Sequence, residues 1–86
     1  MRLKDAEELI QSEKLENYCF FCNETIKEGI VVIEKEANEW IVYTNNERAT
    51  KKGEKRYKAE SEALLDFIER LRGDKAMRKY NLKNLL

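Results

Sequence analysis

The chain has 86 residues, of which 42% are hydrophobic and 40% are charged, and it contains two cysteines but no histidine or proline. This length predicts a single domain over residues 1–86 with a thin core, because a chain of this size buries only roughly 60–65% of its unfolded surface. The apolar content argues against disorder, and the thin core argues against an enclosed substrate cavity.

Positive and negative side chains are unevenly distributed along the chain. Residues 1–46 hold five Lys and Arg against ten Asp and Glu, whereas residues 47–86 hold twelve against seven, so the total net charge is zero. Either the two halves attract each other and mix their charges over the surface, which we expect, or they form separate charged faces.

The first segment predicts an amphipathic helix over Leu3–Lys14, because apolar side chains recur at helical spacing and acidic residues lie early, where the helix dipole favours them. This segment does not resemble a signal peptide. The longest apolar run, Ile30–Ile33, is far too short to span a bilayer. We therefore expect a cytoplasmic protein with no membrane partner.

Runs of β-branched and aromatic side chains then predict strands. The three predicted strands are Tyr18–Cys22, Ile30–Lys35 and Trp40–Thr44. Turns at Lys27–Gly29 and Glu36–Glu39 separate them, and connections this short predict an antiparallel meander. The polar segment that follows leaves open a short fourth strand near Lys55–Lys58.

The last third of the chain predicts two helices. Ser61 is a suitable N-cap, and the first helix runs to Arg72, with Gly73 as its C′ residue. Its apolar positions are Leu64, Phe67, Ile68 and Leu71. A shorter helix restarts at Asp74. The predicted fold is α+β, with a small antiparallel sheet of three or four strands packed by the N-terminal helix and the C-terminal helices.

Cys19 and Cys22 form a C-x-x-C motif. Zinc needs four ligands, and two cysteines without any histidine do not supply them. Redox C-x-x-C motifs begin at a helix N-terminus, whereas this pair falls in a predicted strand, where residues three apart point to opposite faces. We predict buried or half-buried free thiols, which suit a reducing cytosol, and no metal or other cofactor.

Residues suited to catalysis are scarce. The chain lacks histidine, the commonest general base, and it has neither a glycine-rich phosphate loop nor a serine nucleophile motif. Glu34, Glu36 and Glu39 have the spacing of a solvated strand edge or turn. The sequence therefore predicts a protein that is not an enzyme.

A basic run could grip phosphates. It consists of Arg48, Lys51, Lys52, Lys55, Arg56 and Lys58. The order helix, three strands, helix also resembles the double-stranded-RNA-binding domain, but here the helix after the run begins with acidic residues that repel a nucleic-acid backbone. We favour a solvated loop and keep an RNA-binding module at Arg48–Lys58 as the alternative, which tight, steeply salt-dependent binding to duplex RNA would support.

Trp40 and Tyr43 lie three residues apart on a predicted strand, so they point to opposite faces. We expect Trp40 in the core. An aromatic side chain that points outward from a short sheet is a candidate anchor for a partner protein, because Trp and Tyr dominate binding energetics.

The segment W-I-V-Y-T-N-N-E-R-A at Trp40–Ala49, the helix start E-S-E-A-L at Glu60–Leu64 and the run F-I-E-R-L-R at Phe67–Arg72 resemble the immunity protein 59 family of bacterial polymorphic toxin systems. Members of that family have a W-x-V-Y-x-x-x-E-R-A segment and a downstream E-S-E-A-L helix. The opening helix and the aromatic strand after Asn17 also fit, so the resemblance covers Leu3–Arg72.

The resemblance implies a small intracellular protein that neutralises a cognate toxin C-terminal domain by binding it, without chemistry of its own. The acidic half favours a basic toxin such as a nuclease. The expected partner-binding residues, at the sheet edge and turns or matching the family motif, are Glu34, Glu36, Trp40, Tyr43, Asn45, Asn46, Glu47 and Arg48. A homodimer joined through exposed apolar side chains of the sheet is a further possibility.

Overall fold

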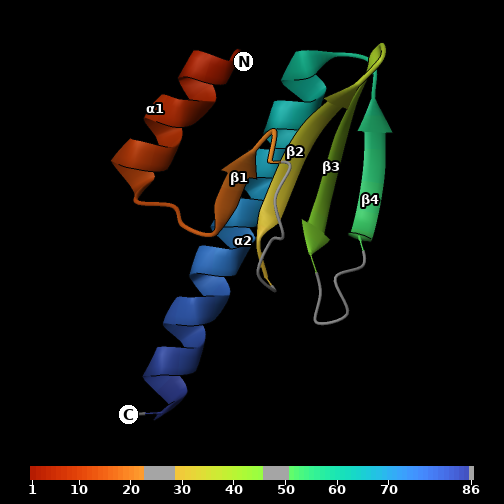
Figure 1. The fold of residues 1–86 in the computed structure, drawn as a ribbon. Coiled ribbons are helices and arrows are strands. Elements are labelled where there is room, and N and C mark those ends of the chain that lie inside the picture. The colour runs from red at the N-terminus through yellow and green to blue at the C-terminus, as the bar shows by residue number, and fades with distance from the viewer. Residues whose placement is uncertain (23–28, 46–50, 86) are drawn as a thin grey trace.

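The computed structural model describes residues 1–22, 29–45 and 51–85, and within these residues the chain forms two helices and four strands (Figure 1). The elements are α1 (Leu3–Glu13), β1 (Tyr18–Phe20), β2 (Val31–Glu36), β3 (Glu39–Asn45), β4 (Lys51–Tyr57) and α2 (Glu60–Leu85). The strands form one sheet in the order β1-β2-β3-β4, and α2 runs behind it in the view of Figure 1. The predicted α+β class is confirmed.

The helix α1 ends one residue earlier than its periodicity predicts. Asp5 accepts a hydrogen bond from the Arg2 backbone N–H at 2.9 Å and so satisfies one donor at the helix start. At the other end Lys14 adopts a left-handed conformation with φ of 54°, and the Leu15 N–H donates to the Ile10 carbonyl. Such a left-handed residue stops a helix and satisfies its last carbonyls.

The prediction of an entirely antiparallel sheet is wrong for the first pair of strands. β1 runs parallel to β2, with Tyr18 opposite Val31 and Phe20 opposite Ile33. β1 ends at Phe20 and β2 begins at Val31, and two parallel strands need a longer connection than a hairpin turn. Local sequence patterns do not specify whether such a pair is parallel or antiparallel.

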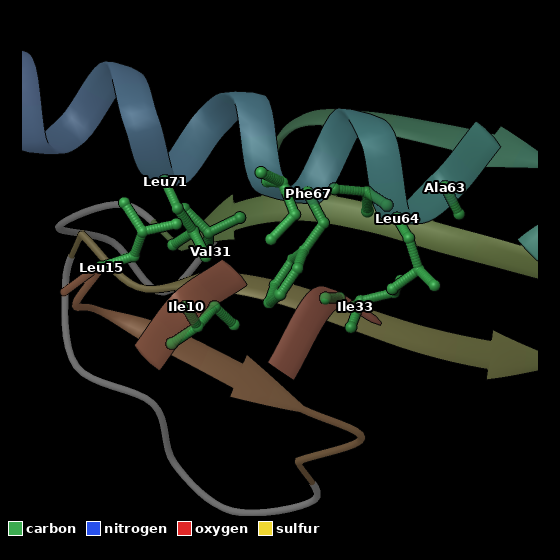
Figure 2. Packing of buried hydrophobic residues seen from close by; sticks show 11 residues of the cluster. Ile10, Leu15, Val31, Ile33, Ala63, Leu64, Phe67 and Leu71 are labelled. Atoms are coloured by element: carbon green, nitrogen blue, oxygen red, sulfur yellow. The ribbon is translucent and has the colours of Figure 1, made fainter. Parts of the chain in front are cut away.

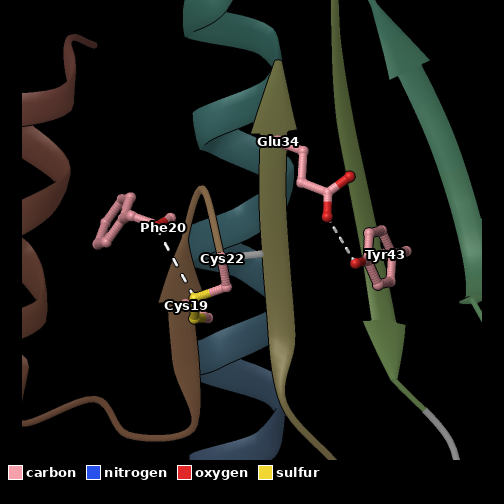
Figure 3. Close-up of a disulfide and its surroundings, with 5 residues drawn as sticks. All are labelled: Cys19, Phe20, Cys22, Glu34 and Tyr43. Atoms are coloured by element: carbon pink, nitrogen blue, oxygen red, sulfur yellow. Dashed lines mark hydrogen bonds between the residues drawn. A yellow bond between two sulfur atoms is a disulfide. The ribbon is translucent and has the colours of Figure 1, made fainter. Parts of the chain in front are cut away.

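The prediction of free thiols is also wrong, since Cys19 and Cys22 form a disulfide (Figure 3). The prediction assumed that both residues lie in one strand. Instead β1 stops at Phe20, and Phe21 adopts a left-handed conformation with φ of 53° that turns the chain. Cys22 is thereby directed back toward Cys19, with 6.0 Å between their Cα atoms.

The remaining strands are antiparallel. β2 and β3 form a hairpin in which Glu36 lies opposite Glu39, which confirms the turn predicted there. β4 is longer than the predicted segment and has a bulge opposite Tyr43, where Gly53 has φ of 63°. Of the turn predicted at Lys27–Gly29, only Gly29 lies among the described residues.

The prediction of two C-terminal helices is wrong, because α2 continues through Gly73 to Leu85. Contacts beyond Gly73 hold the helix against the end of α1. Asp74 accepts a hydrogen bond from the Asn17 side chain at 3.0 Å, Lys75 donates to the Glu13 carbonyl, and Arg78 pairs with Glu16 at 2.6 Å. These tertiary contacts outweigh the local preference of glycine for a helix end.

α2 also starts one residue before the predicted N-cap, so Ser61 lies inside the helix. Glu60 accepts a hydrogen bond from the Leu3 backbone N–H at 3.1 Å. The first turn of α2 is therefore fixed to the first turn of α1, and the two helices meet at both ends of α1.

The main core lies between the two helices and one face of the sheet (Figure 2). Phe67 is fully buried and projects from α2 toward the strands, with Leu64 and Leu71 beside it on the same helix. Its ring centroid lies 5.0 Å from that of Phe20 on β1. The apolar positions predicted for this helix therefore form the centre of the fold.

Candidate functional site

The sheet has one face that neither helix covers within the described residues, and we call it the helix-free face. Strand alternation and register assign side chains to it, because successive residues of a strand point to opposite faces. Its members are Cys19, Val32, Glu34, Glu36, Glu39, Ile41, Tyr43, Asn45, Glu54 and Arg56. The core side chains Val31, Ile33 and Val42 point the other way, toward α2.

The centre of the helix-free face is apolar. Val32, Ile41 and Tyr43 are buried and form a second cluster, against which Cys19 and Ile30 pack. Among the residues that the structure describes, no helical side chain belongs to this cluster. Val32 and Ile41 have no exposed surface, so the cluster stabilises this side of the sheet and the side chains around it are the accessible ones.

Tyr43 is joined to Glu34 across the two central strands. Its hydroxyl donates a hydrogen bond of 2.8 Å to a Glu34 carboxylate oxygen (Figure 3). Burial raises the pKa of Tyr43 to about 12, and the hydrogen bond to Glu34 and the charge of Glu54 act in the same direction. The phenol thus stays protonated at neutral pH and keeps Glu34 in a fixed position.

Carboxylates surround this apolar centre. Of the described side chains on the helix-free face, Glu34, Glu36, Glu39 and Glu54 are acidic, and Arg56 is basic. Arg56 lies 3.7 Å from Glu36, and both side chains are largely solvated, so this pair is weak. The described part of the face is therefore acidic overall.

The structure brings together four of the eight predicted partner-binding residues. Glu34, Glu36, Tyr43 and Asn45 share the helix-free face. Asn45 is buried, and its backbone hydrogen bonds with Gly29 and Ile30 continue the β2–β3 ladder beyond the start of β2. The predicted contacts at Asn46, Glu47 and Arg48 lie outside the described residues.

Trp40 points to the opposite face from Tyr43, as predicted. It packs against the edge of the main core, where it is half-buried, and its ring centroid lies 6.0 Å from that of Phe21. The Lys35 ammonium lies 5.2 Å from the same ring, a cation–π distance. Trp40 therefore cannot join Glu34 and Tyr43 in one contact surface.

Sequence patterns missed a polar network that joins α2 to β3 and β4. The Tyr57 hydroxyl donates to Asp66 at 2.6 Å, and the Arg70 guanidinium donates to the same carboxylate at 2.9 Å. Arg70 also donates to the Gly53 carbonyl at 2.5 Å and to the Thr44 hydroxyl at 3.4 Å. The i,i+4 spacing of Asp66 and Arg70 was the only signal in the sequence. All these contacts are internal, which indicates a structural role.

Ion pairs join the acidic and basic halves of the chain. Arg72 contacts Glu13 at 2.6 Å, and this hydrogen bond lowers the pKa of Glu13 and raises that of Arg72. Arg78 makes a similar pair with Glu16. The two halves therefore meet where α2 lies against the end of α1 and the segment that follows it, as expected for halves that attract each other.

The basic run does not form one stripe where it is described. Lys55 lies opposite Val42 and so points toward the helix side of the sheet, whereas Arg56 lies opposite Ile41 on the helix-free face. Arg48 lies outside the described residues. Alternation along β4 thus divides charges that a nucleic-acid backbone needs on one side.

A shallow cleft of about 200 Å³ lies between α1 and β1. Its lining residues are Glu7, Ile10, Gln11, Tyr18 and Phe20.

In the described parts of the chain, no group of three or more His, Cys, Asp or Glu side chains is placed to hold a metal ion. Neither helix, over its described residues, has the length and apolar character to cross a membrane.

Comparison of the chain with protein-family models, curated protein sequences and solved structures finds no match.

Proposed function

We propose that this chain is an immunity protein that binds a cognate bacterial toxin domain and neutralises it by contact alone. The observation that carries the proposal is the helix-free face, whose accessible side chains, among those described, are mostly carboxylates carried on paired strands. The resemblance of the motifs at Trp40–Ala49 and Glu60–Leu64 to the immunity protein 59 family supports it independently. In this proposal the protein acts in the cytoplasm of the producing cell.

The charge of the face supports a basic partner. Glu36 is exposed at the hairpin end of the sheet and Glu54 is exposed on the edge strand, so both are accessible to a partner. Opposite charges speed the encounter of two proteins and disfavour wrong partners. A toxin that acts on nucleic acid has a basic substrate-binding surface, and an acidic face is complementary to it.

The rigidity of the face supports tight binding. Tyr43 is buried, and its hydrogen bond holds the Glu34 carboxylate in one orientation before any partner arrives. Groups that are already ordered lose less conformational entropy on association. The face is therefore suited to inhibition by binding, which requires affinity and specificity but no turnover.

Co-expression tests this proposal. The partner to test is a C-terminal toxin domain sought in the reading frames that adjoin this gene, and its expression alone should arrest growth. Co-expression with the present chain should restore growth and give a complex that survives gel filtration. Continued growth arrest with both proteins soluble and present would contradict the proposal.

A further inference from the structure

The two cysteines of the chain form a local cross-link at the end of β1. Both side chains are half-buried. Cys19 lies on the strand and packs against the apolar cluster of the helix-free face, whereas Cys22 follows the left-handed residue Phe21. The disulfide therefore closes the turn in which Phe21 lies.

Phe21 links this turn to the rest of the fold through its backbone and its side chain. Its N–H donates a 2.8 Å hydrogen bond to the Ile33 carbonyl, which extends the parallel ladder beyond β1. Its ring packs against Trp40, with 6.0 Å between centroids. A left-handed conformation is unfavourable for a bulky residue unless its surroundings constrain it, and the bridge from Cys19 to Cys22, which encloses Phe21, is one such constraint.

We propose that Cys19 and Cys22 form a reversible thiol–disulfide modification site that fixes the Phe21 turn when oxidised. A small dithiol is the co-reactant. Its thiolate attacks one protein sulfur and breaks the S–S bond, its second thiol resolves the mixed disulfide, and two electrons and two protons pass to the protein. The products are two protein thiols and the oxidised, cyclic form of the dithiol.

The dithiol form keeps the fold but loses the constraint on the turn. The Cys22 sulfur lies 3.8 Å from the Phe20 carbonyl oxygen, so the reduced Cys22 thiol has a hydrogen-bond acceptor within reach. The main core contains neither cysteine, and the ion pairs of α2 with Glu13 and Glu16 involve neither the cysteines nor Phe21. Reduction therefore frees Phe21 from Trp40 without unfolding the domain.

Trp40 is the only tryptophan, so its fluorescence reports this contact directly. The first measurement counts thiols by alkylation and mass spectrometry before and after dithiothreitol, while tryptophan emission is recorded. We expect no free thiol before reduction and two after it, a red shift of the Trp40 emission, and return of both signals with oxidised glutathione. Faster exchange of the Phe21 amide in the reduced protein, by several-fold, should accompany the shift.

Variants distinguish the release of Phe21 from Trp40 from a general loosening of the fold. Phe21→Ala should keep the disulfide but abolish the emission shift on reduction, whereas Leu65→Ala, which removes an exposed side chain from α2, should keep it. Cys22→Ser should show the reduced emission and no response to dithiothreitol. Far-UV circular dichroism checks that each variant is folded.

Three results would overturn the inference: two free thiols in protein treated with oxidised glutathione, an unchanged Trp40 emission after both thiols are released, or loss of the far-UV signal on reduction. None of these results depends on the toxin, so failure here is distinguishable from failure of the proposed function.

Discussion

At the scale of single residues, the described side chains with the most specific environments serve the fold. Phe67 fills the space between α2 and the strands and is fully buried, whereas Leu65, two residues away on the same helix, is 51% exposed. Tyr57 and Arg70 converge on one carboxylate, and Tyr43 holds another. These environments make distinct predictions about stability.

Truncation of the central aromatic residue should be far more costly than truncation of its exposed neighbour. Phe67→Ala should lower the free energy of unfolding by about 3–5 kcal/mol, because it removes buried contacts and leaves a cavity. Leu65→Ala should change it by less than about 0.5 kcal/mol. Urea denaturation of both variants measures the difference, and similar losses would contradict the assigned core.

The two raised tyrosine pKa values predict a loss of stability in alkali. The pKa of Tyr57 rises to about 12, mainly because Asp66 accepts its hydrogen bond, and that of Tyr43 also rises to about 12. The folded state therefore holds two phenolic protons that the unfolded state releases near pH 10. Their contribution to stability is complete below pH 10 and is lost progressively as the pH rises to about 12.

Phenylalanine variants test this pH dependence. Tyr43→Phe and Tyr57→Phe should each reduce the slope of stability against pH between 10 and 12, because each removes one of the two protons. Tyr80→Phe, which changes an exposed side chain, should leave that slope unchanged. Equal slopes in all variants would show that other groups govern alkaline unfolding.

At the scale of elements, sequence patterns located the segments that have a clear period. α1, β2 and β3 begin and end within one residue of their predicted bounds, because apolar spacing and the turn at Glu36–Glu39 specify them locally. β4 was predicted only in part, since its mostly charged residues show no alternation and β3 supplies the pairing. The parallel β1–β2 pair and the Cys19–Cys22 disulfide depend on the path of the chain after Phe20, which no local pattern encodes.

The candidate site was predictable to a similar degree. Alternation along β3 placed Trp40 and Tyr43 on opposite faces. The contact between Glu34 and Tyr43 follows from the register of β2 against β3, which the sequence does not state. The network of Asp66 and Arg70 with β4 likewise depends on how α2 lies across the sheet.

Two glycines test the continuity of α2 and the bulge in β4, respectively. Gly73 lies in its interior, and a Cβ atom there would meet no other atom within 4 Å, so Gly73→Ala should stabilise the protein by about 0.5–1 kcal/mol. Gly53→Ala should instead destabilise it by about 1–2 kcal/mol, because φ at the bulge is 63°. Thermal denaturation gives the sign of each change. Destabilisation by Gly73→Ala would indicate a helix break at that position.

At the scale of the whole molecule, the two faces of the sheet divide structure from recognition. The helices, the main core and the Asp66 network occupy one side, and the acidic, helix-free face occupies the other. Ion pairs of α2 with Glu13 of α1 and with Glu16, which follows α1, join the acidic first half of the chain to the basic second half. The helix-free face is acidic in the described part of the sheet, and it is the face to which we assign the partner.

The most direct test of this assignment is the affinity of charge-reversed variants for the toxin domain, measured by isothermal titration calorimetry. Glu36→Lys with Glu39→Lys reverses the acidic face at the hairpin, and Glu8→Lys with Glu62→Lys makes the same change in net charge on the helices. We predict that the first pair weakens binding by about tenfold or more, since charges at a binding face govern association, and that the second pair leaves it nearly unchanged. Equal affinities for the two double variants would contradict the account.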